Sequence, residues 1–325
     1  AFVRMSQYEE NREEIILGKR RLNRALHGTR RLWVIGTVAA SILIILGGLF
    51  QIGMIGGRLR GSTEVAAITP GSNKAQLILS DGEVVDLHAA VRQLPLSVTG
   101  IIRNDSLEGL KYSGNVGMKE EYNVLQTPVG GFYHLELSDG TRVWLNACSE
   151  LRYPVSFVRK ERRVMLKGEA YFEVAKDEGK PFHVLAKGAD IKVLGTSFNV
   201  MTYRGRTITT LVEGKVCLTY KDESVLMVPD RQAEVIAETG KILMREVDAR
   251  NFTLWKDGVF YFENAALETI AERLSQWYDV NIVFNDEALK KLRYSVEMKR
   301  YNNIQDLLTK IEKTQKVKFL IQGKS

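Results

Sequence analysis

The chain has 325 residues, enough for two ordinary domains with separate cores, and its net charge of +7 comes from 46 basic and 39 acidic side chains. Residues 1–31 hold 8 basic and 4 acidic groups, so more than half of the net charge lies in a short N-terminal tail. The rest of the chain shows no basic stripe with interleaved aromatic side chains, which argues against nucleic acid as a ligand.

An uncharged run at residues 32–57 follows this tail, with no charged side chain between Arg31 and Arg58. Its 26 residues, at about 1.5 Å per residue in a helix, can cross a hydrocarbon core of about 30 Å. The run is longer than the apolar region of a cleavable secretory signal, which has about 7 to 15 residues. We therefore predict a transmembrane helix here rather than a buried core helix, and a helical tail over residues 1–31.

The charges that flank this run predict its orientation. Lys and Arg are in excess on the N-terminal side, so we expect the tail in the cytoplasm and the C-terminal part in the periplasm, outside the inner membrane. Anionic membrane lipid would attract the basic tail. Gly47 and Gly48 lie within the run, where glycine weakens a helix, and we predict an intramembrane cleavage region there.

Residues 58–122 are predicted to form a periplasmic β-hairpin and linker region. Two segments, residues 77–87 and 135–145, repeat one pattern: a strand-like stretch, then Ser-Asp-Gly, then a second strand-like stretch. Asp-Gly supplies the positive φ of a tight two-residue turn, so both segments are predicted to be β-hairpins.

Short strand-like segments continue at close intervals through residues 123–247, and no pattern of normal helix length interrupts them. This spacing predicts a mainly antiparallel β domain, arranged either as a sandwich or as a solenoid-like stack. Cys148 and Cys217 lie in this part. An oxidising compartment could join them, or Cys217 could be a small core residue.

The pattern changes again at residues 253–325, which are predicted to form a small α+β domain with the order β-α-β-β-α-β. Apolar residues at helical spacing mark one helix near residues 266–274 and a second near residues 304–311. Trp255 and Trp277 are predicted to be packing anchors rather than platforms for a ligand.

The sequence shows no motif of catalytic or metal-binding residues. Its four histidines are far apart, and H-E-x-x-H, C-x-x-C, G-x-S-x-G and phosphate-binding glycine loops are absent. We therefore predict no metal, no cofactor and no enzymatic activity, although a catalytic site can also assemble from distant residues.

Five pieces of the sequence form a specific combination: residues 137–147, 168–174, 181–184, 193–200 and 211–216. Together they resemble the FecR family, whose members are single-pass anti-sigma factors of the inner membrane. The last part of the chain resembles the small domain that follows FecR in Bacteroidetes proteins, which is similar to the secretin/TonB short N-terminal domain. The resemblance implies that residues 123–247 are the FecR β domain.

The resemblance also implies a signalling relay. An outer-membrane TonB-dependent transporter binds its substrate, which is a siderophore, a haem or a glycan, and its periplasmic signalling domain engages the outer domains of the FecR-like protein. Site-specific proteases then release the cytoplasmic part, and an extracytoplasmic-function sigma factor is freed or activated. The family binds this sigma factor with several helices, whereas 31 residues precede the membrane run here. We interpret them as a truncated or minimal sigma-binding region.

Two sets of site residues follow from this resemblance. Some FecR-like proteins are thought to cleave themselves at a Gly-Thr of this motif, which corresponds to Gly195 and Thr196. A Thr hydroxyl can attack the preceding carbonyl when a strained turn aligns it; a plain glycine turn is the alternative. For partner docking we predict the small C-terminal domain, with Phe260, Phe262 and Phe284 near its strands, and core packing is the alternative role for these rings.

A second function is kept beside the relay. A structural or glycan-binding protein of the cell envelope, anchored in the inner membrane, would also use a β-rich body of this kind. A sigma-factor gene next to this one, with a TonB-dependent transporter downstream, would favour the relay.

Overall fold

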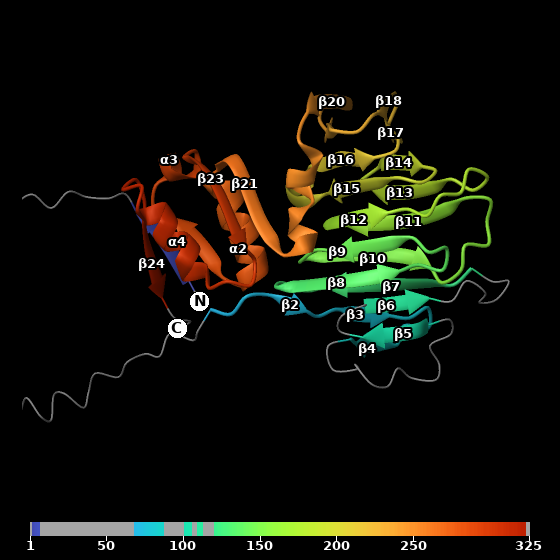
Figure 1. The fold of residues 1–325 in the computed structure, drawn as a ribbon, viewed down its shortest axis with the longest axis horizontal. Coiled ribbons are helices and arrows are strands. Elements are labelled where there is room, and N and C mark those ends of the chain that lie inside the picture. Colours follow the sequence, from blue (N-terminus) through green and yellow to red (C-terminus); the bar gives the residue numbers. More distant parts are fainter. Residues whose placement is uncertain (1, 7–67, 88–100, 106–108, 113–119, 323–325) are drawn as a thin grey trace, which may run out of the picture.

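The computed structural model describes residues 2–6, 68–87, 101–105, 109–112 and 120–322. These residues form a large stack of strands and, beside it, a smaller part that contains the α-helices (Figure 1). We call the strands from β2 to β20 the β body, and we call residues 259–322 the small domain. The predicted fold class, mainly β with a small C-terminal α+β domain, is confirmed.

The β body is built from short strands that follow one another closely along the chain. They are β2 (Ser72–Asn73), β3 (Gln76–Ile78), β4 (Val84–Asp86), β5 (Ile101–Asp105), β6 (Gly109–Tyr112), β7 (Tyr122–Thr127), β8 (Gly131–Glu136), β9 (Arg142–Leu145), β10 (Ser149–Pro154), β11 (Arg162–Lys167), β12 (Glu169–Glu173), β13 (Phe182–Ala186), β14 (Ala189–Val193), β15 (Ser197–Met201), β16 (Thr207–Glu213), β17 (Val216–Tyr220), β18 (Glu223–Met227), β19 (Arg231–Ile236) and β20 (Lys241–Glu246).

Two sheets share these strands. One has the order β18-β17-β14-β13-β11-β10-β7-β3-β4, and the other has the order β20-β19-β16-β15-β12-β9-β8-β6-β5, with β2 paired to β8. From β7 to β20 each sheet follows the chain order, because the chain passes repeatedly from one sheet to the other. The β body is therefore a two-layer sandwich whose chain winds like a solenoid. It combines features of both predicted arrangements, the sandwich and the solenoid-like stack.

Alternating side chains explain how the two sheets meet. Strand β7 alternates half-buried and buried residues along its whole length, and β11 alternates buried and exposed residues. Period-two alternation places every second side chain on one face of a strand. The inward faces of both sheets form one continuous core, with Leu125, Leu151, Phe172 and Phe198 fully buried in it.

Both predicted hairpins are confirmed, but their turns differ from the prediction. Strands β3 and β4 pair antiparallel, as do β8 and β9. Gly82 has φ of +90° and Gly140 has φ of +82°, whereas the preceding aspartates do not have positive φ. A two-residue type I′ turn needs positive φ at both central residues, so each loop instead takes one more residue and ends in a glycine bulge. Asp139 Oδ1 accepts a hydrogen bond from the Thr141 amide at 3.0 Å and fixes the second turn.

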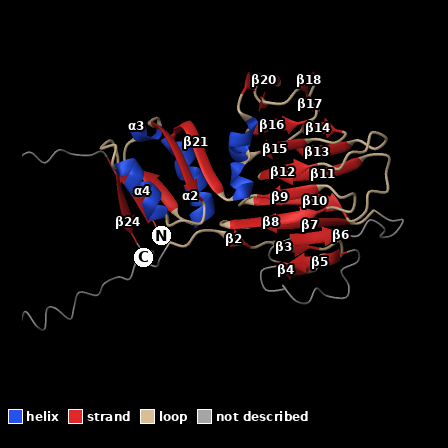
Figure 2. Ribbon diagram, in the orientation of Figure 1, coloured by secondary structure: helices blue, strands red, loops and turns tan. Residues whose placement is uncertain are grey.

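The small domain follows a connector of two short 3₁₀ helices, η3 (Ala249–Phe252) and η4 (Leu254–Asp257). Its elements are β21 (Val259–Ala266), α2 (Leu267–Tyr278), β22 (Asn281–Phe284), α3 (Glu287–Lys290), β23 (Arg293–Lys299), α4 (Ile304–Glu312) and β24 (Lys318–Gln322). The predicted β-α-β-β-α-β order is confirmed, with α3 as an additional helical turn. Figure 2 shows that these α-helices lie in the small domain, whereas the β body is built from strands and loops together with a short 3₁₀ helix, η2 (Tyr203–Gly205).

Apolar faces hold the small domain together. Helix α2 buries Leu267, Ile270, Leu274 and Trp277, and α4 buries residues at the same helical spacing, so both helices face one core. Helix α4 begins after Asn303, whose side chain accepts a hydrogen bond from the backbone amide two residues on. Strands β21 and β23 form one small sheet, and β22 and β24 belong to another.

The predicted helix over residues 1–31 is wrong at its start. Phe2–Ser6 forms strand β1, which lies between β22 and β24 in the small domain. The two neighbouring strands offer backbone hydrogen-bonding groups on both sides, and this pairing outweighs local helix preference.

The membrane run at residues 32–57, with Gly47 and Gly48, lies outside the described residues. Among the residues that the structure does describe, no helix combines the length and the apolar character needed to span a membrane. Cys148 and Cys217 do not form a disulfide; both are free thiols.

Candidate functional site

A buried carboxylate marks the place where the small domain meets the β body. Glu169 begins β12, and its side chain is 4% exposed. Oε2 accepts a hydrogen bond from Arg273 Nη1 at 2.7 Å and one from Asn146 Nδ2 at 2.7 Å, while Oε1 accepts one from Asn199 Nδ2 at 3.1 Å. Arg273 comes from helix α2, whereas the two asparagines come from the β body. A charged pair therefore joins the two parts inside their contact.

A second cation, Arg300, is buried next to this pair. Its Nη2 donates to Asn146 Oδ1 at 2.8 Å, and its Nη1 donates to the carbonyl oxygen of Trp255 at 2.9 Å. The guanidinium stacks on the Trp277 ring, 3.7 Å from the ring centroid. Asn146 thus bonds to Glu169 with its amide nitrogen and to Arg300 with its oxygen, so the three residues form one network.

The connector contributes the third contact of this site. Trp255, in η4, donates its indole N–H to Asn199 Oδ1 at 3.1 Å and packs edge-on against Phe132 of β8. Trp277 donates its indole N–H to the Arg300 carbonyl oxygen at 2.7 Å. Both tryptophans are buried, as predicted for packing anchors, and both also satisfy their polar N–H groups.

Burial and charge act in opposite directions on the two arginines. Burial lowers the pKa of Arg300 to about 10, although Glu169 acts to raise it. Burial also acts to lower the pKa of Arg273, but Glu169 and Tyr203 more than offset it, so the pKa lies above its ordinary value. Both groups are charged at neutral pH. One carboxylate thus faces a half-buried cation, Arg273, and a buried one, Arg300, and the network depends on its charge.

Glycines allow the closest backbone approach at this contact. The Gly130 amide donates to the carbonyl oxygen of Gln276 in α2 at 2.7 Å. A Cβ on Gly71 would lie 2.6 Å from the Gly130 carbonyl oxygen and 2.6 Å from the Trp277 ring, which is closer than atoms pack. A side chain at Gly71 would therefore push the small domain away from the β body.

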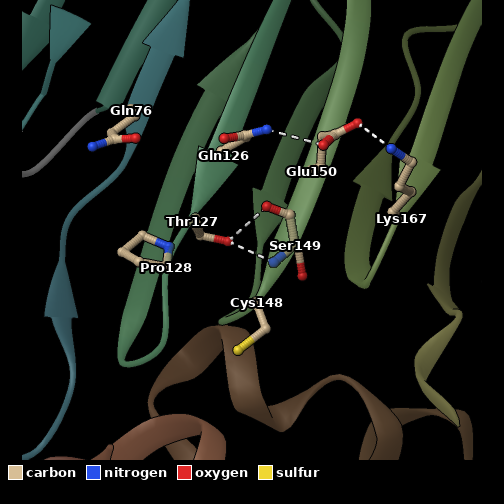
Figure 3. A pocket seen from close by; sticks show the side chains of 8 residues that line it. All are labelled: Gln76, Gln126, Thr127, Pro128, Cys148, Ser149, Glu150 and Lys167. Atoms are coloured by element: carbon tan, nitrogen blue, oxygen red, sulfur yellow. Dashed lines mark hydrogen bonds and ion pairs between the residues drawn. The ribbon is translucent and has the colours of Figure 1, made fainter. Parts of the chain in front are cut away.

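A shallow pocket of about 330 Å³ lies beside the contact, at the ends of β7, β10 and β11 (Figure 3). Thr127 and Ser149 form its wall, where Thr127 Oγ1 accepts a hydrogen bond from the Ser149 amide at 3.1 Å. Lys167 and Gln126 both bond to Glu150. Its lining residues are Gln76, Gln126, Thr127, Pro128, Cys148, Ser149, Glu150 and Lys167. Gln126, Thr127, Ser149, Glu150 and Lys167 already pair with one another.

Cys148, which lines this pocket, is an exposed free cysteine. Burial raises the pKa of Cys148, and the nearby Asp279 raises it further. A thiol must ionise before it attacks, so a raised pKa lowers the fraction of thiolate at neutral pH. Among the described residues, no group of three or more His, Cys, Asp or Glu side chains could hold a metal ion.

The chain matches two protein-family models: FecR protein over residues 123–217, and FecR, C-terminal, over residues 259–325. Two crystal structures of a proposed anti-sigma factor from Parabacteroides distasonis ATCC 8503, at 1.65 Å and 2.50 Å resolution, are similar to it. They are 32% and 31% identical to this chain, and each comparison covers 59% of this chain and 91% of the other, with a TM-score of 0.55. The chain belongs to the FecR family. A search of curated proteins gave no match.

FecR-family proteins are membrane-anchored regulators. In this FecR-family chain the two matched segments lie on either side of the network: Glu169, Asn146 and Asn199 belong to the first, and Arg273 and Arg300 to the second. The site is therefore a contact between the two FecR modules.

The structure places the predicted docking phenylalanines within or beside the core of the small domain. Phe260 is 6% exposed and Phe262 is 8% exposed, and their rings stack at 5.9 Å. Phe284, on β22, is partly buried against the same core and lies in register with Met5 of β1. Phe260 and Phe262 are thus part of the core of the small domain. Phe284 lies on β22, next to β1, the central strand of the sheet β22-β1-β24. Their role in docking stays a prediction.

The predicted self-cleavage pair lies in a tightly packed turn of the FecR module. Thr196 is 5% exposed, and its hydroxyl donates to the Lys215 carbonyl oxygen at 3.0 Å. A Cβ on Gly195 would lie 2.8 Å from the Lys176 Cα atom, so the glycine is required by close packing. Gly195 does not have the left-handed φ of a strained turn. Cleavage here stays a prediction.

The network of Glu169, Arg273 and Arg300 was not predicted from the sequence. One local signal was available for Arg273, which lies three residues after Ile270 and four before Trp277 on the apolar face of α2. A cation within an apolar helix face needs a buried partner. The sequence does not identify that partner, because Glu169 lies 104 residues away.

Proposed function

We propose that this FecR-family protein is an anti-sigma factor that regulates an extracytoplasmic-function sigma factor from the inner membrane. The buried network of Glu169, Arg273 and Arg300 carries this proposal, because it couples the small domain to the β body at a charged contact. A partner that binds the small domain changes the free energy of the contact between the small domain and the β body. The similarity to a proposed anti-sigma factor supports the same role.

The partner outside the membrane is the signalling domain of an outer-membrane TonB-dependent transporter. The small domain offers β-strands to such a partner, and strand addition is a common way for one protein to bind another. The resemblance to FecR proteins supports this choice.

Release of the cytoplasmic part is the proposed output. Residues 32–57 cross the membrane as a single helix, the basic tail binds anionic lipid, and Gly47 and Gly48 let an intramembrane protease open the backbone. Residues 1–31 contact the sigma factor, which requires Phe2–Ser6 to leave its position between β22 and β24, and their release changes the activity of the sigma factor.

The experiment is a transcription reporter for the sigma factor's target promoter in cells that lack this protein and in cells that express it again. We expect loss of the protein to change reporter activity at least tenfold, and the transporter's substrate to change it only when the protein is present. Reporter activity that is the same in both cell types would refute the proposal. Gly47→Leu with Gly48→Leu should leave the protein in the membrane and block the response, whereas a full response would refute the intramembrane step.

A further inference from the structure

The chain that follows the predicted membrane run crosses the contact between the small domain and the β body before it enters the β body. Residues 68–74, which we call the strap, begin 11 residues after Gly57, and Figure 1 shows them running from the small domain to β2. Ile68, at one end, packs partly buried against the small-domain core. At the other end, Ser72 and Asn73 form β2, which pairs parallel with β8. The strap therefore touches both parts of the protein.

Backbone hydrogen bonds attach the strap to the β body. The Ser72 amide donates to the Gly130 carbonyl oxygen at 2.9 Å, and the Lys74 amide donates to the Phe132 carbonyl oxygen at 3.3 Å. Both residues of β2 are exposed, so this strand buries little apolar surface of its own. A parallel strand of two residues with so few contacts lies at the low end of local stability. The β body alone therefore holds the strap weakly.

The small domain covers the strap from the other side. Gly71 is buried, and the Trp277 ring lies so close to it that an added Cβ would be 2.6 Å from a ring atom. Gly130 connects the strap to helix α2: its carbonyl oxygen accepts from the Ser72 amide, and its own amide donates to the Gln276 carbonyl oxygen at 2.7 Å. The bond that holds the strap and the bond that docks α2 thus share one residue.

Two sets of contacts hold the strap in place, and each set is small. An ordered segment loses backbone entropy at every residue, and its contacts must offset that cost. The small domain supplies the packing of Ile68 and the Trp277 ring over Gly71, and the β body supplies the two amide bonds. When the small domain leaves, the remaining bonds do not offset the entropy alone. By linkage, a freed strap in turn weakens the docking of the small domain.

We propose that the strap is a docking-dependent lock on the chain between the membrane run and the β body. With the small domain docked, residues 68–74 are fixed at the contact. With the small domain undocked, the strap opens, and the attachment of this part of the chain moves on to β3, whose Leu77 is fully buried. The inference deepens the proposed function, in which a partner acts on this contact, because it names the segment that carries the change toward the membrane.

The test is hydrogen exchange at single-residue resolution on the full chain in detergent micelles, with no sigma factor or transporter present. Hydrogen-bonded amides exchange through local opening, so each amide reports its own contact. Exchange of the Ser72 amide reports the strap, and exchange of the Gly130 amide reports the docking of α2. Exchange in β13 and β14 reports whether the β body stays folded.

Three contact variants open the lock from different sides. Arg273→Gln weakens docking through Glu169, whereas Trp277→Ala removes the ring that covers the strap. Trp277→Ala is decisive even where it unfolds the small domain, because the strap then loses the same contacts. Ile68→Ser removes the apolar anchor of the strap itself. Val225→Ser is the matched control, since Val225 is also a partly buried apolar residue but packs against the core of the β body.

We expect all three contact variants to raise exchange of the Ser72 and Gly130 amides together, at least tenfold, with exchange in β13 and β14 unchanged. Val225→Ser should leave both amides as in wild type. A Ser72 amide within twofold of wild type in Trp277→Ala would overturn the lock, because the strap would then hold without the small domain. Tenfold faster exchange at Ser72 alone in Ile68→Ser would overturn its coupling to docking. Exchange is measured without partner proteins, so either failure leaves the proposed function standing, and a failed reporter experiment leaves the lock standing.

Discussion

Glu169 and Arg273 lie 104 residues apart in the chain, yet Glu169 Oε2 and Arg273 Nη1 are 2.7 Å apart inside the contact between the two FecR modules. The Glu169 side chain is 4% exposed and the Arg273 side chain is 22% exposed. Removing one partner of such a pair leaves the other charge uncompensated, which costs more than losing a surface ion pair. The contact between the modules should therefore respond strongly to changes at this pair.

Glu169→Gln should destabilise the protein by about 3 to 5 kcal/mol, because it leaves Arg273 and Arg300 without the buried carboxylate. The measurement is urea unfolding of the full chain in detergent micelles, followed by tryptophan fluorescence, to which Trp255 and Trp277 at the contact contribute. Arg206→Gln is the matched control, since Arg206 forms a comparable two-bond pair with Glu234 but its side chain is 54% exposed. That change should cost no more than about 1 kcal/mol. Equal costs for the two variants would contradict the role assigned to Glu169.

Gly71→Ala should loosen the small domain from the β body. The added Cβ would lie 2.6 Å from both the Gly130 carbonyl oxygen and the Trp277 ring, so backbone must shift at a cost of about 1 to 3 kcal/mol. Limited proteolysis should then cleave faster in the connector at residues 249–257. Gly179→Ala is the control, because its Cβ would meet only the Asp177 side chain at 3.6 Å. Faster cleavage in the control, or none in Gly71→Ala, would refute the close-approach argument.

Tyr112 should make the protein lose stability between pH 10 and pH 12. Burial raises its pKa to about 12, whereas an unfolded tyrosine ionises near pH 10. The unfolded chain therefore releases this proton first, and the fold loses about 2 to 3 kcal/mol as pH rises through that window. Tyr112→Phe should show a smaller decline. It should also be less stable at pH 8, since it loses hydrogen bonds to Tyr153 and Asn123.

Arg300 acts in the opposite direction over the same pH range. Its pKa of about 10 lies below the ordinary value of an arginine, so the unfolded chain binds the extra proton and this group favours the fold as pH rises above 10. Wild type and Tyr112→Phe share this contribution, which cancels in their difference. Parallel stability curves for the two proteins would contradict the assignment to Tyr112.

The self-cleavage hypothesis predicts a fragment that begins at Thr196 and co-purifies with the N-terminal part. Thr196→Ala should abolish that fragment, and mass spectrometry of the expressed protein measures it. Thr196→Val separates cleavage from folding, because it loses only the hydrogen bond to Lys215, worth about 1 kcal/mol. A wild-type chain that stays intact in cells would reject the hypothesis and leave the turn with a structural role.

Local patterns predicted the elements well. The alternation of apolar residues predicted the strands, Asp-Gly predicted both hairpins, and helical spacing predicted α2 and α4. These features depend on residues close together in the chain. The number of residues in the turns was wrong by one because Asp81 and Asp139 lack the positive φ that a two-residue loop requires.

Features that depend on distant partners could not be predicted in this way. The alternation of the chain between two sheets depends on which strand pairs with each sheet edge. The formation of strand β1 depends on the gap between β22 and β24. The pairing of Glu169 with Arg273 likewise requires the docked arrangement of the two modules. The sequence marked Arg273 as unusual on its helix but gave no sign of its partner.

The position of Glu169 also has a mechanical consequence. It begins β12, which is hydrogen-bonded to β9 on one side and to β15 on the other, near the middle of its sheet. A pull on the small domain through Arg273 would enter the sheet at this interior strand, where neighbours on both sides share the load. Tension would then move the whole β body toward the pulling partner instead of detaching single strands from the edge of the sheet.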